Sequence, residues 1–199
     1  MAINKTIEAT GELRAKFIDM MNSAGDDKLM IVARSELNRK ADDIKPIAVK
    51  HDIYFYVAKQ LDGALAFLNN VTPDMIYTAK ANTVRNARLG DMFEILGVMG
   101  TAKTLEEIDG LDEPMTIVTS KSGLNGAGVL YCEEFLSQLK AKVGGFYIQP
   151  SSVHEIIIVP EDSGISIDDL SMMVREVNKH EVSDDEYLAN RAFSVDEWL

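Results

Sequence analysis

The chain has 199 residues, of which 46% are hydrophobic and 26% are charged, so a core of normal size can form and general disorder is excluded. Its 32 acidic side chains outnumber 20 basic ones, which gives a formal net charge of −12. Because phosphate backbones repel such a surface, nucleic acid is not expected among the partners.

Cysteine content and hydropathy indicate the compartment. The single cysteine, Cys132, cannot form an intramolecular disulfide and suits a reducing environment. The first residues, MAINKTIEATGELR, lack the apolar segment of a signal peptide. No apolar run approaches the roughly 18 residues that span a membrane. We therefore expect a soluble, cytoplasmic protein that makes no contact with a membrane.

The first 45 residues are expected to form an N-terminal helix, a short strand and a polar linker. Thr10 can cap a helix that runs to about Met21, because large apolar side chains recur there at helical spacing. The apolar segment 28–33 predicts a strand. The charged segment 38–45 predicts a loop that ends at a proline.

The middle of the chain predicts short alternating elements. The triplet Thr72-Pro73-Asp74 is typical of a helix start, with threonine as the cap, proline at the first position and an acid facing the helix dipole. In chain order the expected elements are a strand over 53–58, a helix over 60–68, a helix from 72 to about 83, an extended segment over 92–98 and a short helix over 104–108.

The last 85 residues, 115–199, have the clearest pattern. Two apolar β-rich runs joined by Pro150-Ser151-Ser152 predict a hairpin over 146–160. The other expected elements are a strand over 115–119, a turn over 120–125, a helix over 126–143, a helix over 167–179 capped by Ser166, a short helix over 183–188 and a strand over 193–195.

This order predicts the fold class α+β, with a mixed, mostly antiparallel sheet and helices. The C-terminal half follows the ferredoxin-like order β-α-β-β-α-β. Both faces of the second hairpin strand, 155–160, are apolar, so we expect this strand to be central and covered on both sides. Residues 46–199 are predicted to form the α+β domain, with 115–199 as a subregion and 1–45 joined to it in one compact unit.

Three short patterns resemble an uncharacterised bacterial domain family of unknown function, common in gut Gram-positive bacteria. They are T-x-K-x-x-L-x-G-A from Thr119, Y-I-x-P-S-S-x-H-E from Tyr147 and M-V-R-E-V-N from Met173. The resemblance extends over about residues 53–196. It is specific as a pattern and implies no activity.

The hairpin carries one cluster of residue types that suit nucleophilic or acid-base chemistry: Ser151, Ser152, His154 and Glu155. Adjacent residues on a strand point to opposite faces, so His154 and Glu155 are not expected to serve one serine together. The alternatives are local hydrogen bonding within a turn or a ligand or partner site at the hairpin tip.

The loop 120–128 is the second candidate. Glycine lets a backbone approach an anion, and a helix start offers free N–H groups. The spacing matches neither of the common glycine-rich phosphate motifs. A tight structural turn is the alternative to a ligand site, whose residues would be Lys121, Gly123, Asn125, Gly126 and Gly128.

No metal site and no cofactor are predicted, since the three histidines lie in distant segments. The leading hypothesis is a non-enzymatic binding or regulatory protein that acts through its acidic surface or through self-association. The alternative is an enzyme or sensor that binds a small anionic or nucleotide-like ligand at the 120–128 loop. An obligate homodimer that covers the open sheet face is a third possibility.

Overall fold

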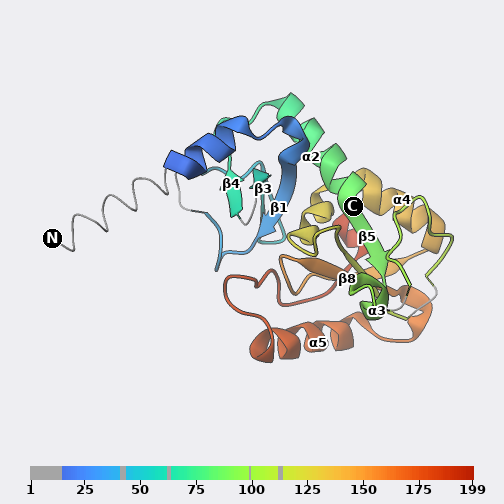
Figure 1. The fold of residues 1–199 in the computed structure, drawn as a ribbon. Coiled ribbons are helices and arrows are strands. Elements are labelled where there is room, and N and C mark those ends of the chain that lie inside the picture. The colour runs from blue at the N-terminus through green and yellow to red at the C-terminus, as the bar shows by residue number, and fades with distance from the viewer. Residues whose placement is uncertain (1–14, 41–43, 62–63, 99, 112–113) are drawn as a thin grey trace.

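The structure is a computed structural model that describes residues 15–40, 44–61, 64–98, 100–111 and 114–199 (Figure 1). Two antiparallel sheets, lying one above the other in Figure 1, form its frame. Helices pack around both sheets, so the α+β class is confirmed.

The first sheet is built around β3. Its four strands are β1 (Leu29–Arg34), β2 (Ala48–Lys50), β3 (Ile53–Leu61) and β4 (Ala64–Phe67). One edge of β3 pairs with β1, and the other edge pairs with β2 along its first half and with β4 along its second. Valine, isoleucine and aromatic side chains predominate in β3 and suit a pleated surface.

The second sheet has the order β5-β6-β8-β7-β9, and all its pairings are antiparallel. Its strands are β5 (Ala87–Gly90), β6 (Thr116–Ser120), β7 (Phe146–Gln149), β8 (Glu155–Pro160) and β9 (Phe193–Ser194). The predicted hairpin and the central position of β8 are confirmed. The closing strand β9 lies beside β7, whereas the ferredoxin-like order would put it beside β6, where β5 pairs instead.

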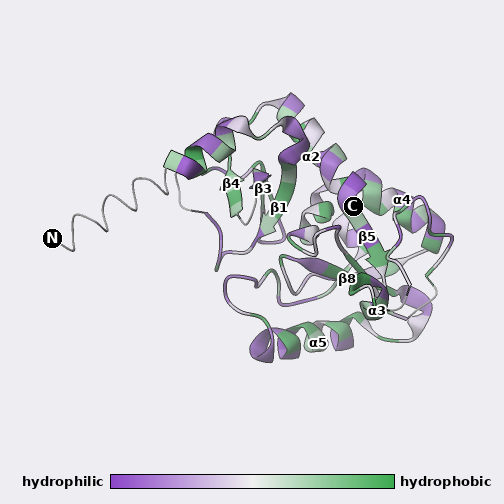
Figure 2. Ribbon diagram, in the orientation of Figure 1, coloured by the Kyte–Doolittle hydropathy of each residue, from purple (hydrophilic) through white to green (hydrophobic). Residues whose placement is uncertain are grey.

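The helices connect and cover the sheets. They are α2 (Pro73–Asn86), α3 (Met92–Ile95), α4 (Glu133–Val143), α5 (Ile167–His180) and α6 (Val195–Trp198), with 3-10 turns η1 (Asp26–Lys28), η2 (Gly126–Tyr131) and η3 (Glu161–Ser163). Residues 15–23 are also helical. The α5 ribbon alternates between hydrophobic and hydrophilic residues in Figure 2, as expected of a helix with one face on the core.

A single buried cluster reaches both sheets. Ile31 and Phe55 of the first sheet belong to the same cluster as Phe146 and Ile156 of the second. The α2 helix bridges the two sheets, because it packs on β1 and leads directly into β5 (Figure 1). Its Thr83 hydroxyl accepts the backbone N–H of Ile31 at 2.9 Å.

Four predicted helical or extended segments differ in the structure. Within the predicted helix 60–68, residues 60–61 end β3 and residues 64–67 form β4, which pairs with β3, so sheet pairing overrides the helix propensity of alanine and leucine. The segment 92–98, expected to be extended, contains α3, whose start has a capping box of Asp91 and Glu94. The segments 104–108 and 183–188 are turns.

The predicted helix over 126–143 is divided. It begins as η2 and continues as α4 after a break at Cys132, whose backbone is not helical. The α2 helix continues to Asn86, beyond its predicted end near residue 83. It is followed by β5, a strand that the sequence did not predict. The start of the predicted N-terminal helix at Thr10 and part of the 38–45 loop lie outside the described residues.

Candidate functional site

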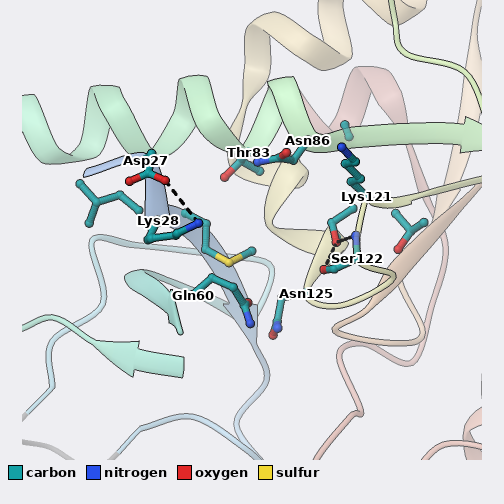
Figure 3. Close-up of a pocket in the computed structure, with 14 residues that line it drawn as sticks. Asp27, Lys28, Gln60, Thr83, Asn86, Lys121, Ser122 and Asn125 are labelled. Atoms are coloured by element: carbon teal, nitrogen blue, oxygen red, sulfur yellow. Dashed lines mark hydrogen bonds and ion pairs between the residues drawn. The ribbon is translucent and has the colours of Figure 1, made fainter. Parts of the chain in front are cut away.

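A pocket of about 270 Å³ lies where β1, the end of α2 and the loop after β6 meet (Figure 3). Its walls come from four separate stretches of the chain. The polar residues labelled in Figure 3 are Asp27, Lys28, Gln60, Thr83, Asn86, Lys121, Ser122 and Asn125. This is the place where the structure gathers the most hydrogen-bonding side chains of different segments around one described cavity.

The loop after β6 is held in shape by Ser120. The Ser120 hydroxyl donates to the carbonyl of Leu124 at 2.8 Å and accepts the backbone N–H groups of Ser122 and Leu124. Gly123 has φ +73°, a left-handed conformation that favours glycine. The Lys121 N–H donates to the carbonyl of Asn86 at 2.7 Å, which joins the loop to the end of α2.

Two of the predicted glycines serve packing. A Cβ at Gly128 would lie 1.9 Å from the carbonyl oxygen of Ile31, and a Cβ at Gly126 would lie 2.5 Å from the Cα of Thr119. Both positions are buried, and η2 crosses β1 at this point. Glycine is therefore needed at both positions because two backbone segments pass too close to each other to leave room for a side chain. Gly126 still lines the pocket, whereas Gly128 does not belong to its walls.

Asn125 connects the pocket to two other parts of the molecule. It has left-handed φ of 56°, a conformation that asparagine tolerates better than most residues. Its backbone N–H donates to Nδ1 of His154 at 3.2 Å. Its side-chain oxygen accepts Nη2 of Arg34 at 3.1 Å. Because arginine only donates, this bond turns the Asn125 amide so that its NH₂ group points away from Arg34.

Arg34 is a buried cation behind the pocket wall. Only 8% of the residue is exposed, and burial lowers the pKa of its guanidinium to about 10. Its hydrogen bonds go to the carbonyl of Ala33 and to Asn125, and its charge lies 5.3 Å above the ring of Phe67. A cation held by neutral acceptors makes the electrostatic potential around Asn125 positive.

Gln60 supplies an unused acceptor at the pocket wall. Its NH₂ group donates to the carbonyl of Leu61 at 3.3 Å. Its Oε1 is buried and has no hydrogen-bond partner within the described ranges. The side chains of Gln60 and Asn125 face each other in Figure 3. The walls of one pocket therefore provide an amide acceptor from Gln60 and the amide NH₂ group of Asn125.

Two lysines contribute positive charge. Lys28 is partly neutralised by Asp27, whose carboxylate lies 3.3 Å from the ammonium group in an exposed pair. The Lys121 side chain extends toward Asn86 at the carboxyl end of α2 (Figure 3). That end of a helix carries partial negative charge, so a structural role for the Lys121 ammonium accompanies any role in binding.

The candidate residues of the hairpin are covered by the segment that follows α5. Ser151 and Ser152 are 7% and 6% exposed. The carbonyls of Pro150 and Ser151 accept N–H groups of Ala189 and Leu188, both at 3.0 Å. The hairpin tip is therefore occupied by the segment that follows α5.

His154 and Glu155 have separate surroundings. The Nε2 atom of His154 lies 3.4 Å from a carboxylate oxygen of Glu186, while Nδ1 faces Asn125. Burial raises the pKa of the Glu155 carboxyl, and a hydrogen bond from Ser152 opposes that shift. The Ser152 hydroxyl accepts the backbone N–H of His154 at 3.0 Å. The imidazole therefore holds the loop after β6 and does not activate either serine.

Of the residues proposed from the sequence, the pocket gathers Lys121, Asn125 and Gly126, and His154 supports them from behind. The sequence analysis missed Gln60, Asn86 and the start of β1. Gln60 was assigned to a helix, whereas it lies in β3, one residue beyond the pairing with β1. No local pattern marked Asn86, because it joins the pocket only through the crossing of α2 over β1.

The described part of the chain contains no group of three metal-binding side chains. Burial raises the pKa of the Cys132 thiol to about 12, so this thiol is not a ready nucleophile. Among the described helices, none is long and apolar enough to cross a membrane.

Comparison with known proteins identifies a family. No curated protein and no solved structure resembles the chain significantly. Residues 60–196 match a family of unknown function, DUF5688. The match covers more than half of the chain and includes both the loop after β6 and the hairpin. The chain therefore belongs to the DUF5688 family of unknown function.

Proposed function

We propose that the protein is a small-molecule binding or sensing protein whose ligand, anionic and nucleotide-like, occupies the pocket between β1, α2 and the 120–126 loop. The observation that carries this proposal is the convergence of Gln60, Asn125 and Lys121 on one cavity of about 270 Å³. Pockets for small ligands characteristically combine an apolar wall with a few convergent polar groups.

The amide pair favours a ligand with a flat donor and acceptor edge. Gln60 offers a free acceptor, and Asn125 offers its NH₂ group because Arg34 occupies its oxygen. A nucleobase presents a complementary acceptor and donor side by side. Satisfying the buried Gln60 oxygen would remove an energetic penalty of about 1–3 kcal/mol that the free protein carries.

The positive charge favours an acidic group on the same ligand. Lys28 and Lys121 line the pocket, and the buried guanidinium of Arg34 lies directly behind Asn125. The protein as a whole is strongly acidic, so two lysines that line one pocket run against its overall charge. A phosphate or carboxylate on the ligand would interact with the lysines while its base faces the amides.

The test is a thermal-shift and calorimetry screen with nucleoside monophosphates and sugar phosphates. We expect at least one compound to raise the melting temperature, with Gln60→Leu and Lys121→Ala each weakening the binding about tenfold or more. Lys179→Ala is the matched control, because it removes the same charge from an exposed position on α5 outside the pocket.

Two results would contradict the proposal. One is a screen without any stabilising compound. The other is binding that Lys121→Ala and Lys179→Ala weaken equally, because a general effect of net charge would then explain the affinity.

We propose a second candidate function, docking of a basic protein partner, from the exposed face of α5. Met172, Met173 and Val177 are 43–51% exposed on this helix. Acidic residues flank them, including Asp168 and Asp169 in the first turn. The last turn of α5 carries Lys179 and His180, so a basic partner would dock by charge complementarity at the acidic first turn.

This second proposal has a separate test. Proteins captured from the native cell extract by the wild type are compared with those captured by Met173→Glu, at low and at high salt. A protein lost with the substitution and also lost at high salt supports docking at α5. If every captured protein is retained by Met173→Glu, or if sedimentation finds a stable dimer of wild-type chains that this substitution dissociates, a basic partner at this face is contradicted.

A further inference from the structure

A second pocket, of about 320 Å³, lies at the opposite end of β1 from the first. It is bounded by the residues after β1, by the turn between β2 and β3, and by the segment 187–193. Its walls share no residue with the first pocket. Any ligand site here is therefore separate from the one in the proposed function.

Two buried polar atoms on residues that line this pocket have no hydrogen-bond partner in the described part of the chain. Ser35 is 3% exposed, and its hydroxyl forms no hydrogen bond within the described ranges, although its backbone N–H donates to Asn38 at 2.9 Å. Nε2 of His51 is also buried without a partner there. Leaving such groups unsatisfied is costly, so their occurrence on two residues that line one cavity indicates a ligand that would complete them.

The backbone at this pocket is strained. His51 and Asp52 form the two-residue turn between β2 and β3, with φ of 50° and 61°. Such turns usually contain asparagine and glycine, because both central residues need left-handed φ. The ring of His51 lies 4.8 Å from that of Phe193 and 5.3 Å from that of Trp198. Strain of this kind is commonly retained where it positions a functional side chain.

Two of the charged side chains that line the pocket, Glu36 and Arg191, are already paired. Glu36 accepts the hydroxyl of Tyr54 at 2.6 Å and also binds Arg39. Arg191 binds Glu197 through both of its terminal nitrogens. The hydrogen-bonding groups at the pocket walls then include the Ser35 hydroxyl, an imidazole nitrogen of His51 and the exposed Asp52 carboxylate. Hydroxyl groups can donate to the carboxylate and accept from the serine and imidazole at the same time.

We propose that this pocket is a second binding site, for a small neutral molecule with several hydroxyl groups, such as a monosaccharide or cyclic polyol. Ser35 and His51 bind its hydroxyl groups from the buried end, and Asp52 accepts from them at the rim. The site does not depend on the proposed function of the first pocket.

The single tryptophan of the chain reports on this site. Trp198 is fully buried and lies against His51. Its fluorescence is followed while D-glucose, D-ribose and myo-inositol are added separately to the full chain. At least one of them is expected to give a saturable change. If all three leave the signal unchanged or change it only linearly with concentration, the pocket holds water alone and the proposal is overturned.

Two variants test whether the polyhydroxylated ligand binds at Ser35 and His51. Ser35→Ala removes one hydroxyl with little change in packing, and it should weaken the binding about tenfold or more. His51→Asn removes the ring nitrogen and keeps a residue that tolerates left-handed φ, and it should have a similar effect. Gln60→Leu, in the first pocket, should leave the affinity unchanged. Equal affinities of the wild type and Ser35→Ala would overturn the assignment, even if His51→Asn failed to fold.

Discussion

Asn125 is the residue on which the first pocket most depends. Its left-handed backbone ends the loop after β6, its oxygen holds a buried arginine, and its N–H is accepted by His154. These contacts join β1, the loop and the hairpin through one side chain and one peptide group. The arrangement explains why His154 is best understood as a positioning residue.

Two variants of His154 distinguish the contributions of its two ring nitrogens to stability. His154→Asn keeps an acceptor near the position of Nδ1, so the Asn125 N–H stays satisfied and the free energy of unfolding should change little. His154→Gln places its polar group nearer to Nε2 and leaves that buried N–H unpaired. We expect a loss of about 1–2 kcal/mol, measured by urea unfolding. Equal losses in the two variants would show that the Nδ1 bond does not matter for stability.

Glu155 makes stability depend on pH. Burial raises the pKa of its carboxyl in the folded protein above the unfolded value, so folding favours the protonated form. This contribution is present at low pH and is lost as pH rises through the folded pKa. Glu155→Gln should therefore be more stable than the wild type at pH 7, with the difference disappearing near pH 4. Urea unfolding at both pH values checks this, and an advantage that persists unchanged at pH 4 would contradict it.

Between elements, the decisive contact is the crossing of η2 over β1. Gly128 lies against the backbone of Ile31, which cannot move without disturbing the pairing of β1 with β3. The close approach fixes one wall of the first pocket relative to the other. It also explains why the predicted long helix begins as a tighter turn.

The Gly128→Ala variant tests this crossing, and Gly123→Ala, at a glycine with open space around it, is its control. The added methyl group would collide with backbone, so we expect a loss of about 3 kcal/mol or more, or failure to fold. Gly123→Ala has open space around the new methyl group and only the cost of left-handed φ, about 1–2 kcal/mol. Thermal unfolding of the two variants compares them. A smaller loss for Gly128→Ala than for Gly123→Ala would contradict the packing account.

Local sequence signals predicted the elements that depend on local chemistry. The caps at Thr72 and Ser166 and the turn at Pro150 identified two helices and the hairpin. The local signals failed where tertiary contacts determine the secondary structure, as in the strand at Gln60 and the helix break at Cys132. The loop residues of the pocket were found because glycine and asparagine are conspicuous. The residues of the opposite wall were not predicted, because β1 and α2 are brought to the pocket by tertiary packing, which no local sequence pattern marks.

At the scale of the whole molecule, the two sheets share one buried cluster. The α2 helix and η2 tie them together, and the segment after α5 adds further bonds, with the Asn38 amide donating to the carbonyls of Asp184 and Tyr187. Such extensive contact between the halves predicts that they unfold together.

One cooperative transition is therefore expected. Urea unfolding followed by the fluorescence of Trp198, near the second sheet, should coincide with unfolding followed by far-ultraviolet circular dichroism. Two separated transitions would contradict the prediction that the chain is one compact unit. A variant at the junction, Thr83→Val, should lower the common midpoint and keep a single transition, because its hydroxyl accepts a buried N–H of β1.

We propose above that the pocket between β1, α2 and the 120–126 loop binds a small anionic ligand with a nucleobase-like edge. The most direct measurement is nuclear magnetic resonance of the side-chain amides of Gln60 and Asn125 during titration with nucleoside monophosphates. We predict saturable shifts of both amides, while the amide of Asn178, on the distant face of α5, stays unchanged. Saturable binding that leaves Gln60 and Asn125 unshifted, or no binding by any of these compounds, would contradict the claim.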